Sequence, residues 1–116
     1  MYIVYGIPNC DTVKKTQTWL KENQVGFEFH NYKKDGITTE KLENWLNQVS
    51  IDELINKKGS TWKALSEEEK ASVVDAQSAI AVILKNESVI KRPLIEENGK
   101  VVALGFDAKK YEEIFK

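Results

Sequence analysis

The spacing of apolar residues changes twice along this chain of 116 residues. Residues 2–5 and 27–31 have the β-branched or alternating pattern of strands, and a strand pattern returns at residues 94–104. Between them, from about residue 38 to 86, apolar residues recur every three or four positions, as on the buried face of a helix. The pattern predicts an α/β fold with an inserted all-helical segment.

The N-terminal part predicts a strand, a helix at residues 11–23 and a second strand. Apolar or small residues at helical spacing form the inner face of that helix: Val13, Thr16 and Leu20. A strand, a helix and a strand in this order form a right-handed unit with parallel strands. The Asp35–Gly36 pair then marks a turn.

The C-terminal part predicts a hairpin and a last helix. Asn98–Gly99 favours a type I′ turn between a strand that begins at Leu94 and a returning strand at residues 101–104. Asp107 is expected to cap the helix. The inner face of that helix is expected to hold three residues: Ala108, Tyr111 and Phe115. Together with the first unit, these elements predict a thioredoxin-like fold in a single domain, residues 1–116.

Helix-start signals divide the middle segment. Thr38 or Thr39 is expected to cap an amphipathic helix with four inward residues: Leu42, Trp45, Leu46 and Val49. Ser50 and Ser66 each stand three residues before a glutamate, which is the capping-box pattern, and the stretch 59–61 separates the two helices. Asp75 is expected to cap a further helix with the inner face Ala76, Ala79, Ile80, Ile83 and Leu84.

Composition narrows the class of protein. Lys and Arg number 17 against 18 Asp and Glu, so the formal charge of −1 argues against direct binding to nucleic acid or to an anionic membrane surface. The longest apolar run, Ala79–Leu84, is six residues, and no signal-peptide pattern opens the sequence. A single cysteine, Cys10, cannot form an internal disulfide, which favours a reducing, cytoplasmic location.

Cys10 is the first candidate for chemistry, because it stands where the first loop meets the first helix. The free N–H groups and the dipole at a helix start stabilise a thiolate. Asn9 precedes it, Lys14 is a nearby cation, and Arg92 becomes a second cation if the fold brings it close. The alternative is that Cys10 serves only as a small apolar residue.

Arg92 and Pro93 are the second candidates. A cis proline at the start of this strand leaves the preceding backbone free to bind a ligand, and the planar guanidinium of Arg92 suits an oxyanion or a carboxylate. The alternative is a solvated cation before a strand-edge proline. The start of the last helix, at Asp107, is a weak anion site, although Asp107 is also simply a good N-cap. The only histidine, His30, is interpreted as structural or surface, so no metal site is expected.

Four motifs in order resemble the ArsC-like proteins, most closely their YffB-type branch, over essentially the whole chain. The motifs lie at residues 5–15, 59–63, 90–94 and 104–106. The resemblance implies a thioredoxin-like fold with a helical insertion and Cys10 as a nucleophile that is resolved by glutathione delivered with glutaredoxin. The arsenate reductases of this family hold the oxyanion with three arginines. Only Arg92 is kept here, and the other two positions fall on Asn56 and Gly105, so efficient arsenate reduction is not expected.

The same relatives include the Spx regulators, which bind RNA polymerase and sense oxidation through a Cys-x-x-Cys pair. Val13 stands at the second position of that pair, so an internal disulfide switch is excluded here. The leading hypothesis is a glutathione-linked thiol reductase without a bound cofactor. Cys10 and Arg92 would be catalytic, and five residues would bind substrate: Asn9, Lys14, Arg92, Pro93 and Asp107. The alternatives are a regulator that binds an RNA polymerase subunit and a weak arsenate reductase.

Overall fold

The computed structural model describes residues 1–116. The chain forms two compact units: residues 1–36 together with 92–116, and residues 37–91. The helical segment predicted for residues 38–86 falls within the second unit, which continues to Lys91. The single domain, residues 1–116, remains a prediction.

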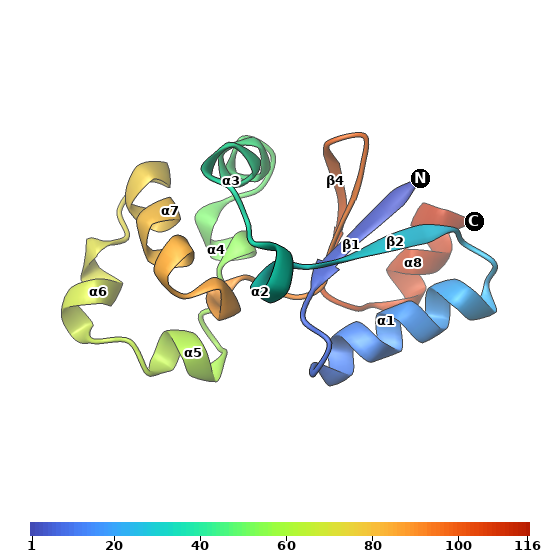
Figure 1. Ribbon diagram of the computed structural model, residues 1–116, viewed down its shortest axis with the longest axis horizontal. Coiled ribbons are helices and arrows are strands. Elements are labelled where there is room, and N and C mark those ends of the chain that lie inside the picture. Colours follow the sequence, from blue (N-terminus) through green and yellow to red (C-terminus); the bar gives the residue numbers. More distant parts are fainter. The chain divides into compact units, whose positions relative to one another are not determined.

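The first unit contains a four-stranded sheet in the order β2-β1-β3-β4. Figure 1 labels three of these strands, β1, β2 and β4. Its elements are β1 (Tyr2–Gly6), α1 (Asp11–Glu22), β2 (Phe27–Asn31), α2 (Tyr32–Asp35), β3 (Leu94–Glu97), β4 (Lys100–Leu104) and α8 (Ala108–Phe115). Strands β1 and β2 are parallel, whereas β3 is antiparallel to both β1 and β4. The predicted thioredoxin-like topology is therefore confirmed.

Helices α1 and α8 cover the same face of this sheet. Val4 of β1 and Ile95 of β3 are register partners, and both pack in one buried cluster with Leu20 of α1 and Tyr111 of α8. The inner face predicted for α1 is confirmed, because its three residues are buried. In α8 the prediction is wrong for Ala108, which is exposed because it is the first residue of the helix, directly after the exposed N-cap Asp107.

The opposite face of the sheet holds a buried carboxyl group. Glu96 is 1% exposed, and its Oε1 accepts a hydrogen bond from the Tyr5 hydroxyl at 2.8 Å. Burial, together with the hydrogen bond to Glu96 and its charge, raises the pKa of Tyr5. The His30 ring lies 4.8 Å from the Tyr5 ring, and its Nε2 is 2.9 Å from the Gly36 carbonyl oxygen. His30 is thus a structural residue of this face.

The hairpin turn adopts the expected backbone. Asn98 and Gly99 have φ values of 52° and 82°, as a type I′ turn requires at both central residues. The register of β3 with β4 shifts between Ile95 and Glu96, so a bulge interrupts the ladder there.

The second unit is almost entirely helical. It comprises α3 (Thr39–Leu46), α4 (Ile51–Leu54), α5 (Ser60–Lys63), α6 (Glu67–Ser72), α7 (Ala76–Lys85) and a 3-10 turn at Glu87–Val89. Its buried apolar residues include Leu42, Trp45, Leu54, Trp62, Ala79, Ile80, Val82 and Ile83. An isolated antiparallel bridge joins Ile55 to Ile90. No helix of either unit is long and apolar enough to cross a membrane.

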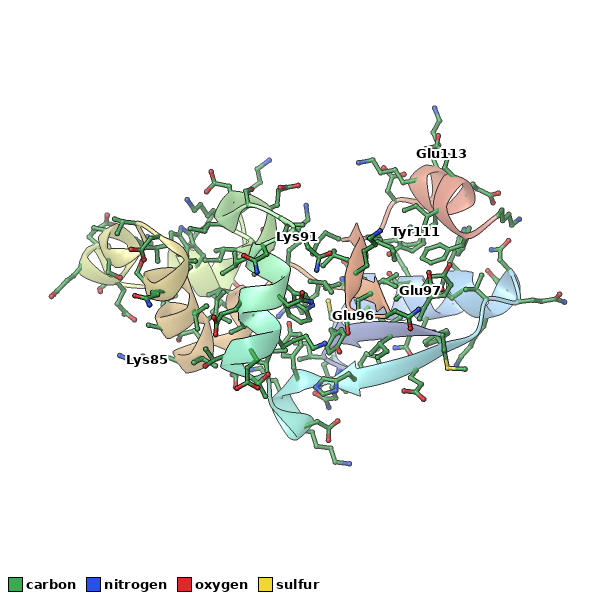
Figure 2. All side chains as sticks on the ribbon, turned by 90° about the horizontal axis from the view of Figure 1, so that it is seen from above. Lys85, Lys91, Glu96, Glu97, Tyr111 and Glu113 are labelled. Atoms are coloured by element: carbon green, nitrogen blue, oxygen red, sulfur yellow. The ribbon has the colours of Figure 1, made fainter.

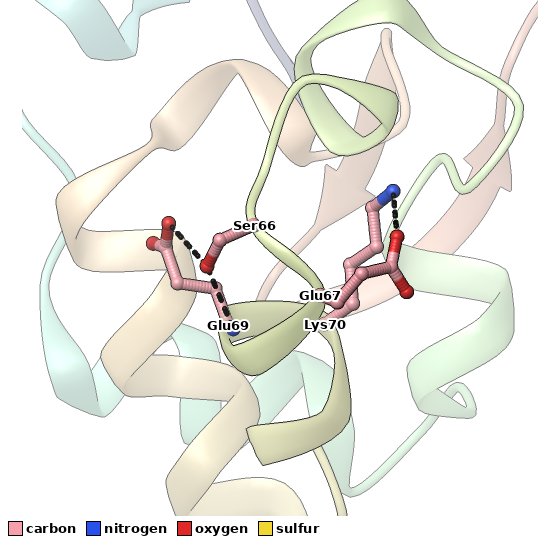
Figure 3. Close-up of polar contacts among 4 residues, drawn as sticks. All are labelled: Ser66, Glu67, Glu69 and Lys70. Carbon is pink, nitrogen blue, oxygen red and sulfur yellow. Dashed lines mark hydrogen bonds and ion pairs between the residues drawn. The ribbon is translucent and has the colours of Figure 1, made fainter.

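The predicted caps of these helices are confirmed. Thr38 accepts the N–H of Lys41, and Asp75 forms a reciprocal capping box with Ser78. The Ser50 box is complete, with Glu53 bonded back to the Ser50 N–H. The Ser66 hydroxyl also accepts the Glu69 N–H, at 3.0 Å. The Glu69 carboxylate, however, accepts from the Ser66 hydroxyl and not from the Ser66 backbone N–H, so this box is incomplete (Figure 3).

Three details of this unit differ from the prediction. Helix α3 ends at Leu46, so Val49, predicted on its inner face, lies beyond the helix. The stretch 59–61 is predicted only to separate two helices, whereas a further helix, α5, begins within it at Ser60, directly after Gly59. In α7 the buried face includes Val82, whereas Ala76 and Leu84 are exposed, the latter at 41%. Successive helical residues are rotated by about 100°, so a face centred between Ala79 and Ile83 leaves Leu84 at its margin.

Candidate functional site

Cys10 is the N-cap residue of α1, with φ −135° and ψ 119°. Its carbonyl accepts the N–H of Lys14 at 3.0 Å, while its side chain makes no capping bond. Cys10 is half-buried. It therefore lies at the positive end of the dipole of a 12-residue helix, in the loop that follows β1.

Gly6 and Val13 determine how closely this helix start approaches the sheet. Val13 is fully buried in the first turn of α1 and packs directly against the position of Gly6 at the end of β1. Because both residues flank the loop 7–10, their contact positions Cys10 relative to the sheet.

Three segments leave the sheet at the same edge, the one where β1 and β4 end and β3 begins. This is the site edge. Tyr5 near the end of β1 is the register partner of Leu94 at the start of β3, and Leu94 pairs with Leu104 at the end of β4. The loop that carries Cys10, the residues that precede β3 and the turn that follows β4 therefore lie at one edge. This topology places Cys10 and Arg92 at the same edge of the sheet.

The turn after β4 is bonded to the residue before β3. The Gly105 N–H donates to the Pro93 carbonyl at 2.8 Å, and the Arg92–Pro93 peptide bond is cis, as the sequence suggests. Gly105 has a φ of 79°, in the left-handed region that favours glycine. An arginine at this position would be strained, so the backbone of this turn itself disfavours the missing family arginine.

Asp107 acts as the N-cap of α8. Its Oδ1 accepts the N–H groups of Lys109 and Lys110 at 3.1 and 3.2 Å. The helix start that the sequence suggests as an anion site is thus bound by the protein's own carboxylate. Of the two interpretations of Asp107, the capping role is the one that the contacts support.

A groove of about 320 Å³ begins one helical turn from Cys10. It is lined by Lys14, Lys15, Thr18, Trp19, Glu22 and Phe106. Lys14 therefore belongs to the wall between α1 and the loop before α8. Of the remaining predicted site residues, Asn9 is exposed in the loop before Cys10, Arg92 is half-buried and Pro93 is buried.

Asn56 belongs to the helical unit. Its N–H donates to the Val89 carbonyl at 2.8 Å, and a Cβ placed on Gly59 would lie 2.8 Å from the Asn56 Nδ2. The side-chain amide is therefore packed against the backbone of its own loop. An uncharged, internally packed group stands where the resemblance places an arginine.

Sequence reasoning did not single out two residues of the site edge, Gly6 and Tyr111. The signal that could have identified Gly6 is its position between a buried strand and the loop that carries Cys10. The Tyr111 hydroxyl contacts the Gly105 carbonyl and lies near Thr16, and no local pattern indicates those partners. No cluster of three or more His, Cys, Asp or Glu side chains that could hold a metal ion is present.

Comparison with known proteins identifies the family of this chain. The model of the ArsC family matches residues 5–114. The chain belongs to the ArsC family. This ArsC-family chain is 40% identical to an uncharacterized protein of Haemophilus influenzae over 115 residues, which cover 99% of each chain. It is 38% identical to the solved structure of a YffB protein, with a TM-score of 0.92 and full coverage of both chains.

A more distant relative is a regulator. The ArsC-family chain is 26% identical to the regulatory protein MgsR of Bacillus subtilis, over 84% of this chain and 78% of that protein. The family and this relative together support a role, at the level of the family, as a thiol reductase or as a regulatory protein.

Proposed function

We propose that this ArsC-family protein is a thiol-dependent reductase in which Cys10 is the nucleophile and glutathione is the external thiol. The observation that carries the proposal is the position of Cys10 as the N-cap residue of α1, at the same sheet edge as Arg92. A helix start favours the thiolate, and Arg92 adds a cation at that edge. We propose the cytoplasm as its location, since a lone thiol and an external thiol donor both suit a reducing compartment.

The reaction proceeds by two thiol–disulfide exchanges. The Cys10 thiolate attacks one sulfur of a mixed disulfide between glutathione and a substrate thiol. A bond forms between Cys10 and the glutathione sulfur, the substrate S–S bond breaks, and the substrate leaves as a thiolate. A second glutathione thiolate then attacks the Cys10 mixed disulfide, which regenerates the Cys10 thiolate and releases glutathione disulfide. Two glutathione molecules end oxidised and the substrate ends reduced.

An external thiol is required because the chain contains one cysteine. Val13 occupies the position of a resolving cysteine in a Cys-x-x-Cys pair, and it is buried against Gly6. In this proposal Arg92 stabilises the Cys10 thiolate or a ligand carboxylate. Asn9, Lys14, Pro93 and Asp107 surround the ligand, with Asp107 acting mainly through the start of α8 that it caps.

The test is a coupled assay with glutathione, glutathione reductase and NADPH on the mixed disulfide of glutathione and 2-mercaptoethanol. Wild-type protein should consume NADPH above the uncatalysed rate, and Cys10→Ser should abolish that excess. Circular dichroism spectra of the two proteins should match, so that lost activity is not lost fold. An excess rate that survives in Cys10→Ser would overturn the proposal.

A second candidate function is favoured by the similarity to MgsR: a regulator that binds an RNA polymerase subunit. This function requires a stable complex with little dependence on Cys10. Pull-down with purified polymerase, using wild type and Cys10→Ala, separates the two functions. Equal capture by both proteins, together with an inactive coupled assay, would favour the regulator.

A third candidate, weak arsenate reduction, is disfavoured by Asn56 and by the positive φ of Gly105. Each missing arginine removes charge-assisted hydrogen bonds worth about 1.5–3 kcal/mol. We expect little arsenite when arsenate, glutathione and glutaredoxin are supplied, and arsenite formation at the rate of the coupled assay would contradict this.

A further inference from the structure

Tyr111 connects α8 to two other segments of the first unit. Its ring is 1% exposed in the core under the sheet, and it projects from α8 toward the strands (Figure 2). Its hydroxyl oxygen lies 2.6 Å from the Gly105 carbonyl oxygen and 3.5 Å from the Thr16 hydroxyl. Thr16 in turn donates to the Thr12 carbonyl at 2.9 Å, two residues after Cys10.

The direction of these hydrogen bonds follows from counting protons. A carbonyl only accepts, so the single proton of Tyr111 is donated to Gly105. By the same count, the single proton of Thr16 is donated to the Thr12 carbonyl, so the two hydroxyl oxygens, 3.5 Å apart, are in contact without a proton committed between them. Burial raises the pKa of Tyr111 to about 12, so the donor proton is present at neutral pH.

Gly105 carries the connection to the third segment, because its N–H donates to the Pro93 carbonyl. The two polar groups of one glycine thus join Tyr111 to the residue that follows Arg92. The same hydroxyl also contacts Thr16 of α1, the helix whose N-cap is Cys10. One buried hydroxyl therefore bonds to the Gly105 turn, which is itself bonded to Pro93, and touches the helix that Cys10 caps.

We propose that Tyr111 is a positioning residue: its hydroxyl holds the Gly105 turn and the Arg92–Pro93 segment in register with the Cys10 helix. This inference rests on the proposed reductase function and extends it to a residue that does not touch the substrate. The segments that it positions are those that would bind the glutathione moiety. Loss of the hydroxyl should therefore weaken substrate binding more than it alters the Cys10 thiol itself.

The alternative is that Tyr111 matters only as a core aromatic ring. Its ring packs edge-on against Trp19, Phe106 and Phe115, with centroids 5.4, 5.2 and 5.3 Å away. Tyr111→Phe keeps all three ring contacts and removes only the hydroxyl. The variant therefore separates the positioning role from the packing role.

The experiment compares wild type with Tyr111→Phe in the coupled glutathione assay, well below the midpoint of thermal unfolding. We expect the KM for the mixed disulfide to rise about three- to tenfold, because one buried hydrogen bond is lost, and we expect kcat to change less. The rate of Cys10 alkylation by iodoacetamide, and its pH midpoint, should stay within about twofold of wild type. Hydrogen exchange of the Gly105 amide, followed by NMR, should accelerate.

Two further variants serve as controls. Tyr2→Phe removes a hydroxyl from the same aromatic cluster, at the opposite end of β1, and should leave both the KM and Gly105 exchange unchanged. Thr16→Val removes the longer contact and should have a smaller effect than Tyr111→Phe. A Tyr111→Phe protein with wild-type KM and wild-type Gly105 exchange would overturn the positioning role. Activity that survives in Cys10→Ser would instead overturn the reductase function. In that case hydrogen exchange of the Gly105 amide would still test whether the Tyr111 hydroxyl stabilises the Gly105 turn.

Discussion

Val13 of α1 packs so closely against Gly6 of β1 that a side chain at position 6 would collide with it. A Cβ at Gly6 would lie 2.8 Å from one methyl carbon of Val13 and 3.4 Å from the other. Gly6 has no positive φ, so the glycine is required by this close approach and not by backbone conformation. The residue type at position 6 therefore determines how closely the Cys10 helix can approach β1.

We predict that Gly6→Ala lowers the free energy of unfolding by about 1–3 kcal/mol, the usual cost of overpacking a core. Urea denaturation measures it. Gly26→Ala is the matched control, because a Cβ there meets only the end of the flexible Met1 side chain, at 3.9 Å. Adding Val13→Ala should relieve the clash, so the double variant should be more stable than the sum of the two single effects. Additive effects would show that the Gly6–Val13 contact is not the cause.

Much of the fold follows from local signals in the sequence. The strands, the hairpin and the helix caps at Thr38, Ser50, Asp75 and Asp107 were predictable, because each depends on residues close together in the chain. Helix α2 was not, since a four-residue helix has no periodicity, and its cap is Asn31, which also ends a strand. Glu96 was also hidden: a charged residue in a strand suggests solvent, and its partner Tyr5 is 91 residues away.

The candidate site was predictable in part for the same reason. Strand order brings the segments of Cys10 and Arg92 to one edge, and strand order follows from the sequence of elements. The hydroxyl contact of Tyr111 with Gly105 depends on how α8 is rotated against the sheet, which only tertiary packing determines. Asp107 showed two possible roles in sequence, and only its bonds to the helix N–H groups distinguish them.

Substitutions at Asp107 should separate capping from ligand binding. Asp107→Ala should cost about 0.5–2 kcal/mol of stability through loss of the cap, whereas Asp107→Asn should cost little, because asparagine caps equally well. Thermal unfolding measures both. If the charge of Asp107 also binds substrate, Asp107→Asn will raise the KM in the coupled assay without a change in stability. Equal destabilisation by both substitutions would contradict the capping role.

The Tyr5–Glu96 pair should be a strong local determinant of stability. Tyr5→Phe leaves the buried Glu96 carboxyl without the donor at 2.8 Å, which should cost about 1–3 kcal/mol of unfolding free energy. Tyr2→Phe, on the other face of the same strand, is the control and should cost less. Chemical denaturation at neutral pH measures the difference, and equal stability of the two variants would show that the hydrogen bond contributes nothing net.

The stabilising effect of the Tyr111 hydroxyl should disappear in alkali. Its pKa is about 12 in the folded protein, against an ordinary value of 10.0, chiefly because of burial. The unfolded chain therefore releases this proton first, so the contribution is complete below pH 10 and is lost as pH rises through about 12. In that window the free energy of unfolding should fall by about 1.4 kcal/mol per pH unit for this group. Urea titrations of wild type and Tyr111→Phe between pH 9 and 12 measure it, and the stability difference between them should shrink across the window. A difference that is constant with pH would mean that Tyr111 ionises equally in the folded and unfolded chain.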